Sequence, residues 1–198
     1  MIDSTILAGL LGVGGSIAGT ILGYKLNNTK ADINVYIDNR VVLYYMEQNF
    51  AMYVPITITN EGSKSATISD FKIKLISPNN QVWDLFWYSF AEDNGHKNEP
   101  WSDGKRASPV LIHGNSGTQH HIKVIELGLT SKGLSNVTLP SGAYSLELEY
   151  FDRDKKPVSK QKYSLNIGTE AHESLAKLRL DKEGLQTWVF PLEREIKA

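Results

Sequence analysis

The sequence predicts a mainly-β protein with three parts: an N-terminal membrane-spanning helix, an antiparallel β-sandwich and a short C-terminal helix. Three observations predict it. An uncharged apolar stretch precedes Lys25, alternating apolar and polar residues recur over 33–167, and apolar residues at helical spacing follow Thr169. The chain is accordingly divided into a glycine-rich transmembrane helix (1–28), a β-sandwich domain (29–168) and a C-terminal helix with a docking segment (169–198).

The N-terminal segment from Ile6 to Leu26 has the length and composition of a membrane-spanning helix. A helix needs about 20 predominantly apolar residues to cross a hydrocarbon core. The large aliphatic side chains here together favour insertion by roughly 2 to 5 kcal/mol. A removable signal peptide is the alternative, but the basic leading region that it requires is absent, and Asp3 occupies that region.

Small residues cover one face of this predicted helix. They recur at a spacing of four in two adjoining rows, which lets the backbone of a second helix approach closely. This glycine-zipper pattern predicts association with a second copy of the chain or with the helix of a larger membrane complex. A lone anchor is the alternative. The residues predicted to lie at the helix contact are Ala8, Gly12, Gly15, Ser16, Gly19 and Gly23.

The basic residues around the predicted helix determine its expected orientation. No Lys or Arg precedes the helix, whereas Lys25, Lys30 and Arg40 follow it. Because short cytoplasmic flanks carry the excess of Lys and Arg, the C-terminal part is expected in the cytoplasm. The sequence therefore predicts a single-pass protein of the inner membrane.

Composition excludes several function classes. The 198 residues carry a formal net charge of −1 with mixed signs, so no basic stripe predicts a nucleic-acid partner. The chain contains no cysteine, which excludes disulfides, thiolate chemistry and cysteine-ligated zinc. The part that follows Asp32 is long enough for one compact domain with a core of its own.

Beyond residue 32 the apolar residues alternate with polar ones, as in half-buried strands. About eight such runs are separated by polar turns, without a helix between them, which favours an antiparallel sandwich over a parallel sheet. The expected strands are 33–37, 41–46, 53–60, 71–75, 81–90, 120–127, 143–151 and 160–167.

Two stretches carry a resemblance to a known fold family. They read VPITITNEGSKSATISDFKIKLISPNNQVWDL and LPSGAYSLELEYFDRDKKPVSKQKYSLNI. In them a strand ends in Asn-x-Gly and a Pro-x-Gly-x-Tyr turn opens a late strand, which resembles the hairpins of bacterial immunoglobulin-like domains. The resemblance implies an immunoglobulin-like β-sandwich, with Tyr144 similar to the corner tyrosine of such domains. By analogy it also implies a role in binding or assembly.

The sequence gives little support for enzyme chemistry. His113, His120, His121 and Glu126 are the nearest candidates for metal ligands, but adjacent strand residues point to opposite faces, which separates His120 from His121. The acidic residues of 152–154 lie in a predicted turn, where backbone conformation favours them. We therefore expect no catalytic residue, no metal site and no cofactor.

Aromatic residues predict a contact surface. The run from Val82 to Phe90 is apolar on both faces, so its outer face is covered by the same chain, by another subunit or by the membrane surface. Another aromatic lies in the polar stretch 91–108, which we expect to be a loop, and a further one in the C-terminal segment. The tryptophans predicted to bind a partner are Trp83, Trp87, Trp101 and Trp188.

Together these patterns predict a non-enzymatic membrane protein that oligomerises through its helix and binds a protein partner or signal with a cytoplasmic β-sandwich. By analogy with glycine-faced helices in oligomeric membrane assemblies, one hypothesis is a membrane-disrupting effector in bacterial anti-phage defence. Two alternatives stay open: an accessory or scaffold subunit of a larger membrane complex, and an envelope-exposed binding protein.

Overall fold

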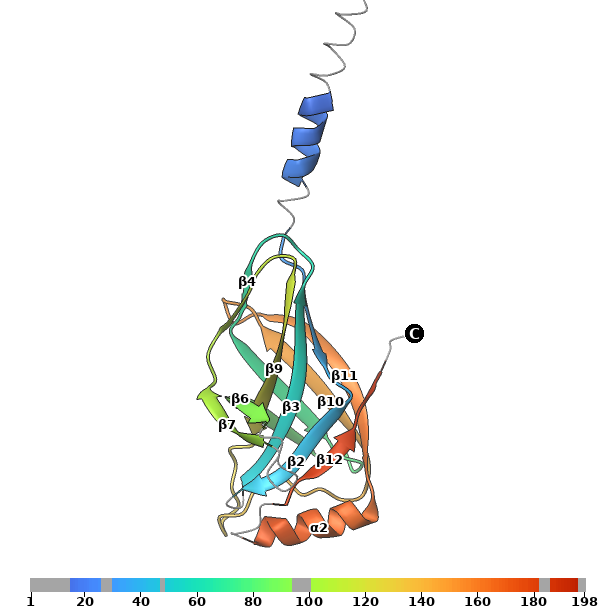
Figure 1. Ribbon diagram of the computed structural model, residues 1–198. Coiled ribbons are helices and arrows are strands. Elements are labelled where there is room, and N and C mark those ends of the chain that lie inside the picture. The colour runs from blue at the N-terminus through green and yellow to red at the C-terminus, as the bar shows by residue number, and fades with distance from the viewer. Residues whose placement is uncertain (1–14, 26–29, 47–48, 94–100, 182–185, 196–198) are drawn as a thin grey trace, which may run out of the picture.

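The computed structural model describes residues 15–25, 30–46, 49–93, 101–181 and 186–195 (Figure 1). A helical segment at 15–25 precedes a domain made of strands and one helix, α2 (Thr169–Leu180). The strands are β1 (Ile33–Ile37), β2 (Arg40–Met46), β3 (Asn49–Asn60), β4 (Ala66–Ile68), β5 (Asp70–Ile76), β6 (Val82–Asp93), β7 (Trp101–Arg106), β8 (Val110–Ile112), β9 (Ser116–Ile125), β10 (Gly142–Phe151), β11 (Pro157–Ile167), β12 (Trp188–Pro191) and β13 (Glu193–Arg194).

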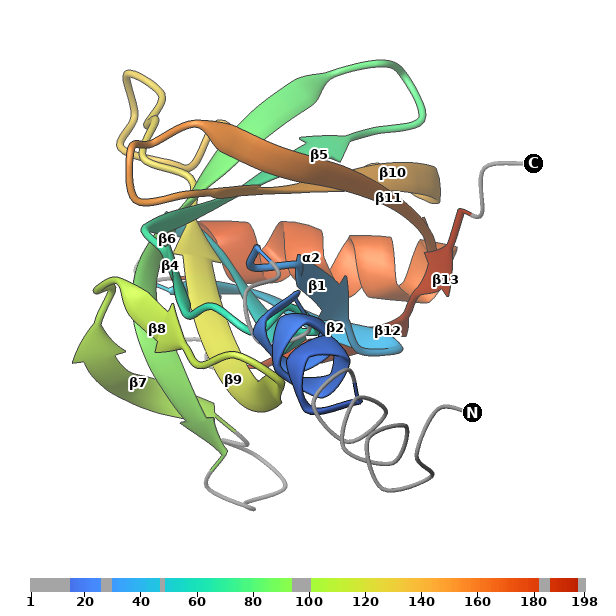
Figure 2. The same ribbon diagram turned by 90° about the horizontal axis from the view of Figure 1, so that it is seen from above.

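The predicted mainly-β, antiparallel architecture is confirmed. In the described residues, 11 strands form one sheet in the order β12-β2-β3-β9-β6-β5-β10-β11-β13, with β1 paired to β3 and β7 paired to β6. Strands β4 and β8 form a separate two-stranded sheet. The large sheet curls around a single interior (Figure 2), whereas a sandwich consists of two separate sheets.

The C-terminal segment brings the two ends of the large sheet together. Strand β12 pairs with β2 at one end of the strand order, and β13 pairs with β11 at the other end. Only Leu192 separates β12 from β13 in the chain, so one short stretch of backbone connects both ends. Residues 188–194 of the C-terminal segment therefore pair with strands at both ends of the sheet.

The interior of the curled sheet holds the main hydrophobic core. Every strand of the sheet except β7 and β13 contributes buried side chains to it, for example Leu43, Ile73 and Leu148. Two core tyrosines also bond to the backbone of β1. The Tyr150 hydroxyl donates to the carbonyl oxygen of Ile33 at 2.6 Å, and the amide of Ile37 donates to the hydroxyl of Tyr163 at 2.9 Å.

Helix α2 covers one open end of the curled sheet (Figure 1). Its spacing of apolar residues predicted this helix, and Ala171, Leu175 and Leu178 are buried against the core. The helix also holds the chain that leads into β10, because the guanidinium of Arg179 donates to the carbonyl oxygen of Ser135 at 2.7 and 3.0 Å. These contacts fix the end of the domain that lies opposite the N-terminal helix.

Asn60 organises the other end of the domain, from which the N-terminal helix extends. Its side-chain oxygen accepts from the amides of Gly62 and Asp32, both at 3.1 Å, and its side-chain amide donates to the carbonyl oxygens of Lys64 at 2.8 Å and His113 at 3.1 Å. Asn60 thus joins the chain after the N-terminal helix to two loops. The Asn-x-Gly pattern has a steric cause as well, since a Cβ on Gly62 would lie 1.8 Å from a backbone oxygen.

Replacing Asn60 with Ala should lower the free energy of unfolding by about 1–2 kcal/mol, because several partly buried backbone groups lose their partner while water can reach some of them. Urea unfolding followed by circular dichroism measures the change. The matched control is Asn166→Ala, whose side chain is exposed on β11. Equal unfolding free energies for the two variants would contradict this role of Asn60.

Charged residues on the outer surface of β10 and β11 give the domain a predictable response to acid. The carboxylate of Glu147 is buried and ion-paired with Lys160 and Lys162. Burial alone raises the pKa of Glu147, but the hydrogen bonds and charges of the two lysines outweigh burial and lower the pKa below its ordinary value of 4.5.

Because the folded state holds the Glu147 pKa below that of the unfolded chain, the ion pairs stabilise the domain above the unfolded pKa and cease to do so as pH falls through the folded pKa. We expect the urea midpoint to fall between about pH 5 and pH 3, and to fall less in Glu147→Gln. Parallel pH profiles for the wild type and the variant would refute the assignment.

The helical segment at 15–25 extends away from the domain (Figure 1). The predicted membrane span, 6–26, begins and ends outside the described residues, and Ala8 and Gly12 also lie outside them. Within the described part of the chain, none of the helices combines the length and apolarity required to cross a bilayer.

Candidate functional site

A second hydrophobic cluster lies on the outer face of the large sheet. We call it the outer aromatic cluster. It is formed by β2, β3 and the β6–β7 hairpin, and it is separate from the main core. Its buried members are Val42, Tyr44, Ala51, Tyr53, Ala91 and Trp101. An apolar cluster on the outer face requires cover, and β7 supplies part of that cover by pairing with β6.

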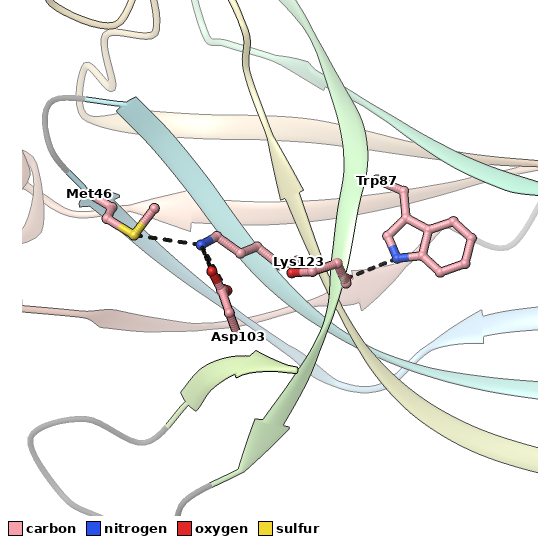
Figure 3. Close-up of polar contacts among 5 residues, drawn as sticks. Met46, Trp87, Asp103 and Lys123 are labelled. Carbon is pink, nitrogen blue, oxygen red and sulfur yellow. Dashed lines mark hydrogen bonds and ion pairs between the residues drawn. The ribbon is translucent and has the colours of Figure 1, made fainter. Parts of the chain in front are cut away.

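Lys123 on β9 lies against this cluster, and its side chain is fully buried. Figure 3 shows its amine between Asp103 of β7 and Met46 of β2. The amine donates to both carboxylate oxygens of Asp103, at 2.8 and 2.9 Å, and lies 3.6 Å from the sulfur of Met46. A buried ammonium needs such a partner, so the ion pair fastens β7 to the outer face of the sheet.

Three tyrosine rings surround the Lys123 amine. It lies 5.8 Å from the ring centre of Tyr44, 5.9 Å from that of Tyr53 and 5.5 Å from that of Tyr88, within cation–π range. The rings of Tyr44 and Tyr53 stack with their centres 4.9 Å apart. Burial raises the pKa of both phenols above the ordinary value of 10.0, so they stay neutral and contribute ring faces.

Trp101 connects this cluster to β9. Its ring stacks on Tyr53 with centres 5.6 Å apart and meets the ring of His121 edge-on at 4.1 Å. The side chain is buried, so Trp101 pins its own segment to the domain. The polar stretch 91–108 was predicted to be a loop, but its residues 101–106 form β7.

The path of β6 opens a cavity beside the cluster. Register shifts at Trp87/Ser89 and at Ser89/Ala91 mark two irregularities in β6, and the register with β9 ends at the pair Ala91–His121. An open cavity of about 320 Å³ lies where the two strands separate. Its lining includes Phe90, Glu92, Lys105, Gln119, His120 and His121.

The cavity brings together two histidines that the sequence assigned to opposite faces. Because the cavity lies where the pairing of β6 with β9 ends, His120 and His121 both contribute to its wall. Burial lowers the pKa of His120, which keeps its imidazole neutral near neutral pH.

The carboxylate of Glu126, another candidate metal ligand from the sequence, accepts a hydrogen bond from the amide of Gly128 at 2.8 Å. In the part of the chain that the structure describes, no three potential metal ligands gather.

The four tryptophans predicted to bind a partner all pack within the chain. Trp83 and Trp87 face the interior and are each 8% exposed, and the indole of Trp87 donates to the carbonyl oxygen of Ser89 at 3.0 Å. Trp188 is half-buried, and its indole donates to the hydroxyl of Ser174 at 3.0 Å. Trp101 is buried as described above. Their role toward a partner stays a prediction.

The outer face of β6 differs from its inner face. The run from Val82 to Phe90 was predicted to be apolar on both sides, and its inner face is buried. On the outer face, Phe86 is 42% exposed and Tyr88 is 48% exposed. These two rings are much more exposed than the two tryptophans of β6.

The sequence carries no signal for the ion pair of Lys123 and Asp103. Lys123 lies between Ile122 and Val124, and this alternation is typical of a strand lysine that faces water. Lys123 is buried because β7 covers the outer face of the sheet, and β7 is held there by its pairing with β6.

Comparisons with solved structures give matches of low identity. A crystal structure assigned to the ApaA protein of Bordetella pertussis matches 68% of this chain and 94% of its own at 12% identity, with a TM-score of 0.35. A FixG-related protein from Vibrio parahaemolyticus matches 70% and 96% at 8% identity, with a TM-score of 0.34. A family 123 glycoside hydrolase from Clostridium perfringens matches 70% of this chain and 28% of its own at 12% identity, with a TM-score of 0.36. No protein-family model and no curated protein matches the sequence.

Proposed function

We propose that this chain is a non-enzymatic membrane-anchored protein that assembles through its N-terminal helix and binds a partner or signal with its β domain. The observation that carries the proposal is the exposed apolar surface of the helix at 15–25. Ile17 and Ile21 are each 55% exposed and Leu22 is 60% exposed. Such a surface needs lipid or another helix as cover.

The sequence before Gly15 is also apolar, with Ile6, Leu7, Leu10, Leu11 and Val13. If the helix continues back to Ile6, its apolar part reaches about 30 Å, the thickness of a hydrocarbon core. The basic residues Lys25 and Lys30 then lie at one membrane boundary and favour a cytoplasmic location for the domain.

The glycines of the helix support assembly. A Cβ built on Gly15, Gly19 or Gly23 meets nothing within 4 Å, so these positions are open to the backbone of a second helix. Close backbone approach at small residues is how membrane helices associate without a hydrophobic driving force.

The β domain supports the binding role in two ways. Its core is closed by α2 and by the C-terminal segment, so the domain holds its surface groups in fixed positions. The cavity between β6, β7 and β9 gathers charged, amide, imidazole and aromatic groups in one place. The buried amine of Lys123 is engaged by Asp103, which favours a structural role over catalysis.

Carbonate extraction of bacterial membranes, followed by protease treatment of intact cells, tests the proposal. We expect the full chain to stay in the membrane pellet, a chain lacking residues 1–26 to be soluble, and external protease to spare the domain. Recovery of the full chain in the carbonate supernatant would refute the anchor. External cleavage of the domain would refute the cytoplasmic orientation and favour an envelope-exposed binding protein.

A separate experiment distinguishes the two hypotheses for the role of the assembly. A membrane-disrupting effector in anti-phage defence should make a bilayer leaky when it assembles, whereas an accessory subunit should co-purify with a larger complex. Dye release from vesicles that contain the full chain separates these two hypotheses.

A further inference from the structure

We propose that the cavity between β6, β7 and β9 binds a small zwitterion of the α-amino acid class that carries an apolar side group. This inference builds on the proposed signal-binding role of the β domain and names the chemistry of the signal. The three features that carry it are the size of the cavity, the pair of opposite charges on its wall, and the aromatic surface on the rest of the wall.

The size of the cavity suits a small molecule. A volume of about 320 Å³ lies at the lower end of the range for ligand pockets, and the cavity is open to solvent. Register shifts in β6 create this opening, so it is a feature of the backbone path.

Opposite charges line the cavity on two neighbouring strands. Glu92 belongs to β6 and Lys105 to β7, and both side chains are exposed to solvent in the opening. Gly104 lets β7 pass close to the acidic side chain, because a Cβ at this position would lie 3.3 Å from Cγ of Glu92 and 3.2 Å from the carbonyl oxygen of Phe90. A carboxylate suits the ammonium of a ligand, and an amine suits its carboxylate.

The remaining wall offers an apolar and neutral surface. The rings of Phe90 and His120 lie with their centres 5.4 Å apart, and burial favours the uncharged form of His120. His121 is held edge-on against Trp101, at 4.1 Å, which fixes that side of the cavity to the outer aromatic cluster. An apolar side group would contact these rings while the charged ends meet Glu92 and Lys105.

Isothermal titration of the detergent-solubilised full chain tests the site with three related probes. Phenylalanine carries both charges, phenethylamine lacks the carboxylate and 3-phenylpropionate lacks the ammonium. We expect saturable binding of phenylalanine, and binding of each of the other two weaker by about tenfold or more. The variants are Lys105→Met and Glu92→Gln, with Lys132→Met and Glu173→Gln, which change exposed residues of the same types, as controls.

Each variant should lose the selectivity that its charge supplies. Lys105→Met should bind phenylalanine and phenethylamine about equally, and Glu92→Gln should bind phenylalanine and 3-phenylpropionate about equally, while the controls behave as the wild type. Absence of phenylalanine binding up to about 10 mM, or equal effects of the site and control variants, would overturn the proposal. Carbonate extraction of the wild-type chain keeps the two proposals apart, since a chain that stays in the membrane pellet but does not bind phenylalanine contradicts the ligand site alone.

Discussion

Replacing Asp103 with Ala is expected to lower the free energy of unfolding by about 2–3 kcal/mol, because the variant leaves the amine of Lys123 buried without its carboxylate. Breaking a fully buried ion pair costs about 3–5 kcal/mol. The expected loss is smaller here because the Asp103 side chain is 42% exposed, so water entering at that side can solvate part of the charge.

Urea unfolding monitored by tryptophan fluorescence measures this loss, with Asp154→Ala in an exposed turn as the matched control. The double variant Asp103→Leu, Lys123→Met should recover most of the stability, since it removes both charges and keeps the side-chain volume. A single Asp103→Ala variant within about 0.5 kcal/mol of the wild type would show that the ion pair does not hold β7.

Replacing Gly15 and Gly19 with Leu should dissociate the oligomer but leave the protein in the membrane. The larger side chains increase the hydrophobicity of the helix but push neighbouring backbones apart, so anchoring and association respond in opposite directions. We expect the crosslinked oligomer fraction to fall by about tenfold or more, equivalent to about 1.4 kcal/mol.

The matched control for this pair is Ile17→Leu with Ile21→Leu, which changes two residues outside the glycine row at constant volume. Crosslinking in isolated membranes compares the variants at equal expression. If the glycine variant and the isoleucine variant give the same oligomer ladder, the glycine row is not the helix contact.

The sequence predicted those elements that carry their own periodicity. Helix α2 follows from Ala171, Leu175 and Leu178, and the long strands follow from alternation, as in β3 and β10. Strands β4, β7, β8, β12 and β13 were missed, because each is short and has no apolar alternation long enough to stand out. Their strand conformation results from pairing with a neighbour that the sequence does not identify.

The closure of the sheet and the candidate site depend on such pairings. The sandwich prediction treated the strands as two layers, but β6 pairs with β5 over its first half and with β7 and β9 over its second half, which carries one sheet around the core. The same change of partners opens the cavity and buries Lys123. Residue spacing alone does not encode where a long strand changes partners.

The measurement that tests the central claim most directly is the molecular mass of the full chain in mild detergent, obtained by light scattering with the detergent contribution subtracted. We expect a particle mass that is a defined multiple of the 22.1 kDa chain and that falls to the mass of one chain when Gly15 and Gly19 are replaced with Leu. A wild-type particle that contains one chain at every protein concentration would contradict assembly through the helix.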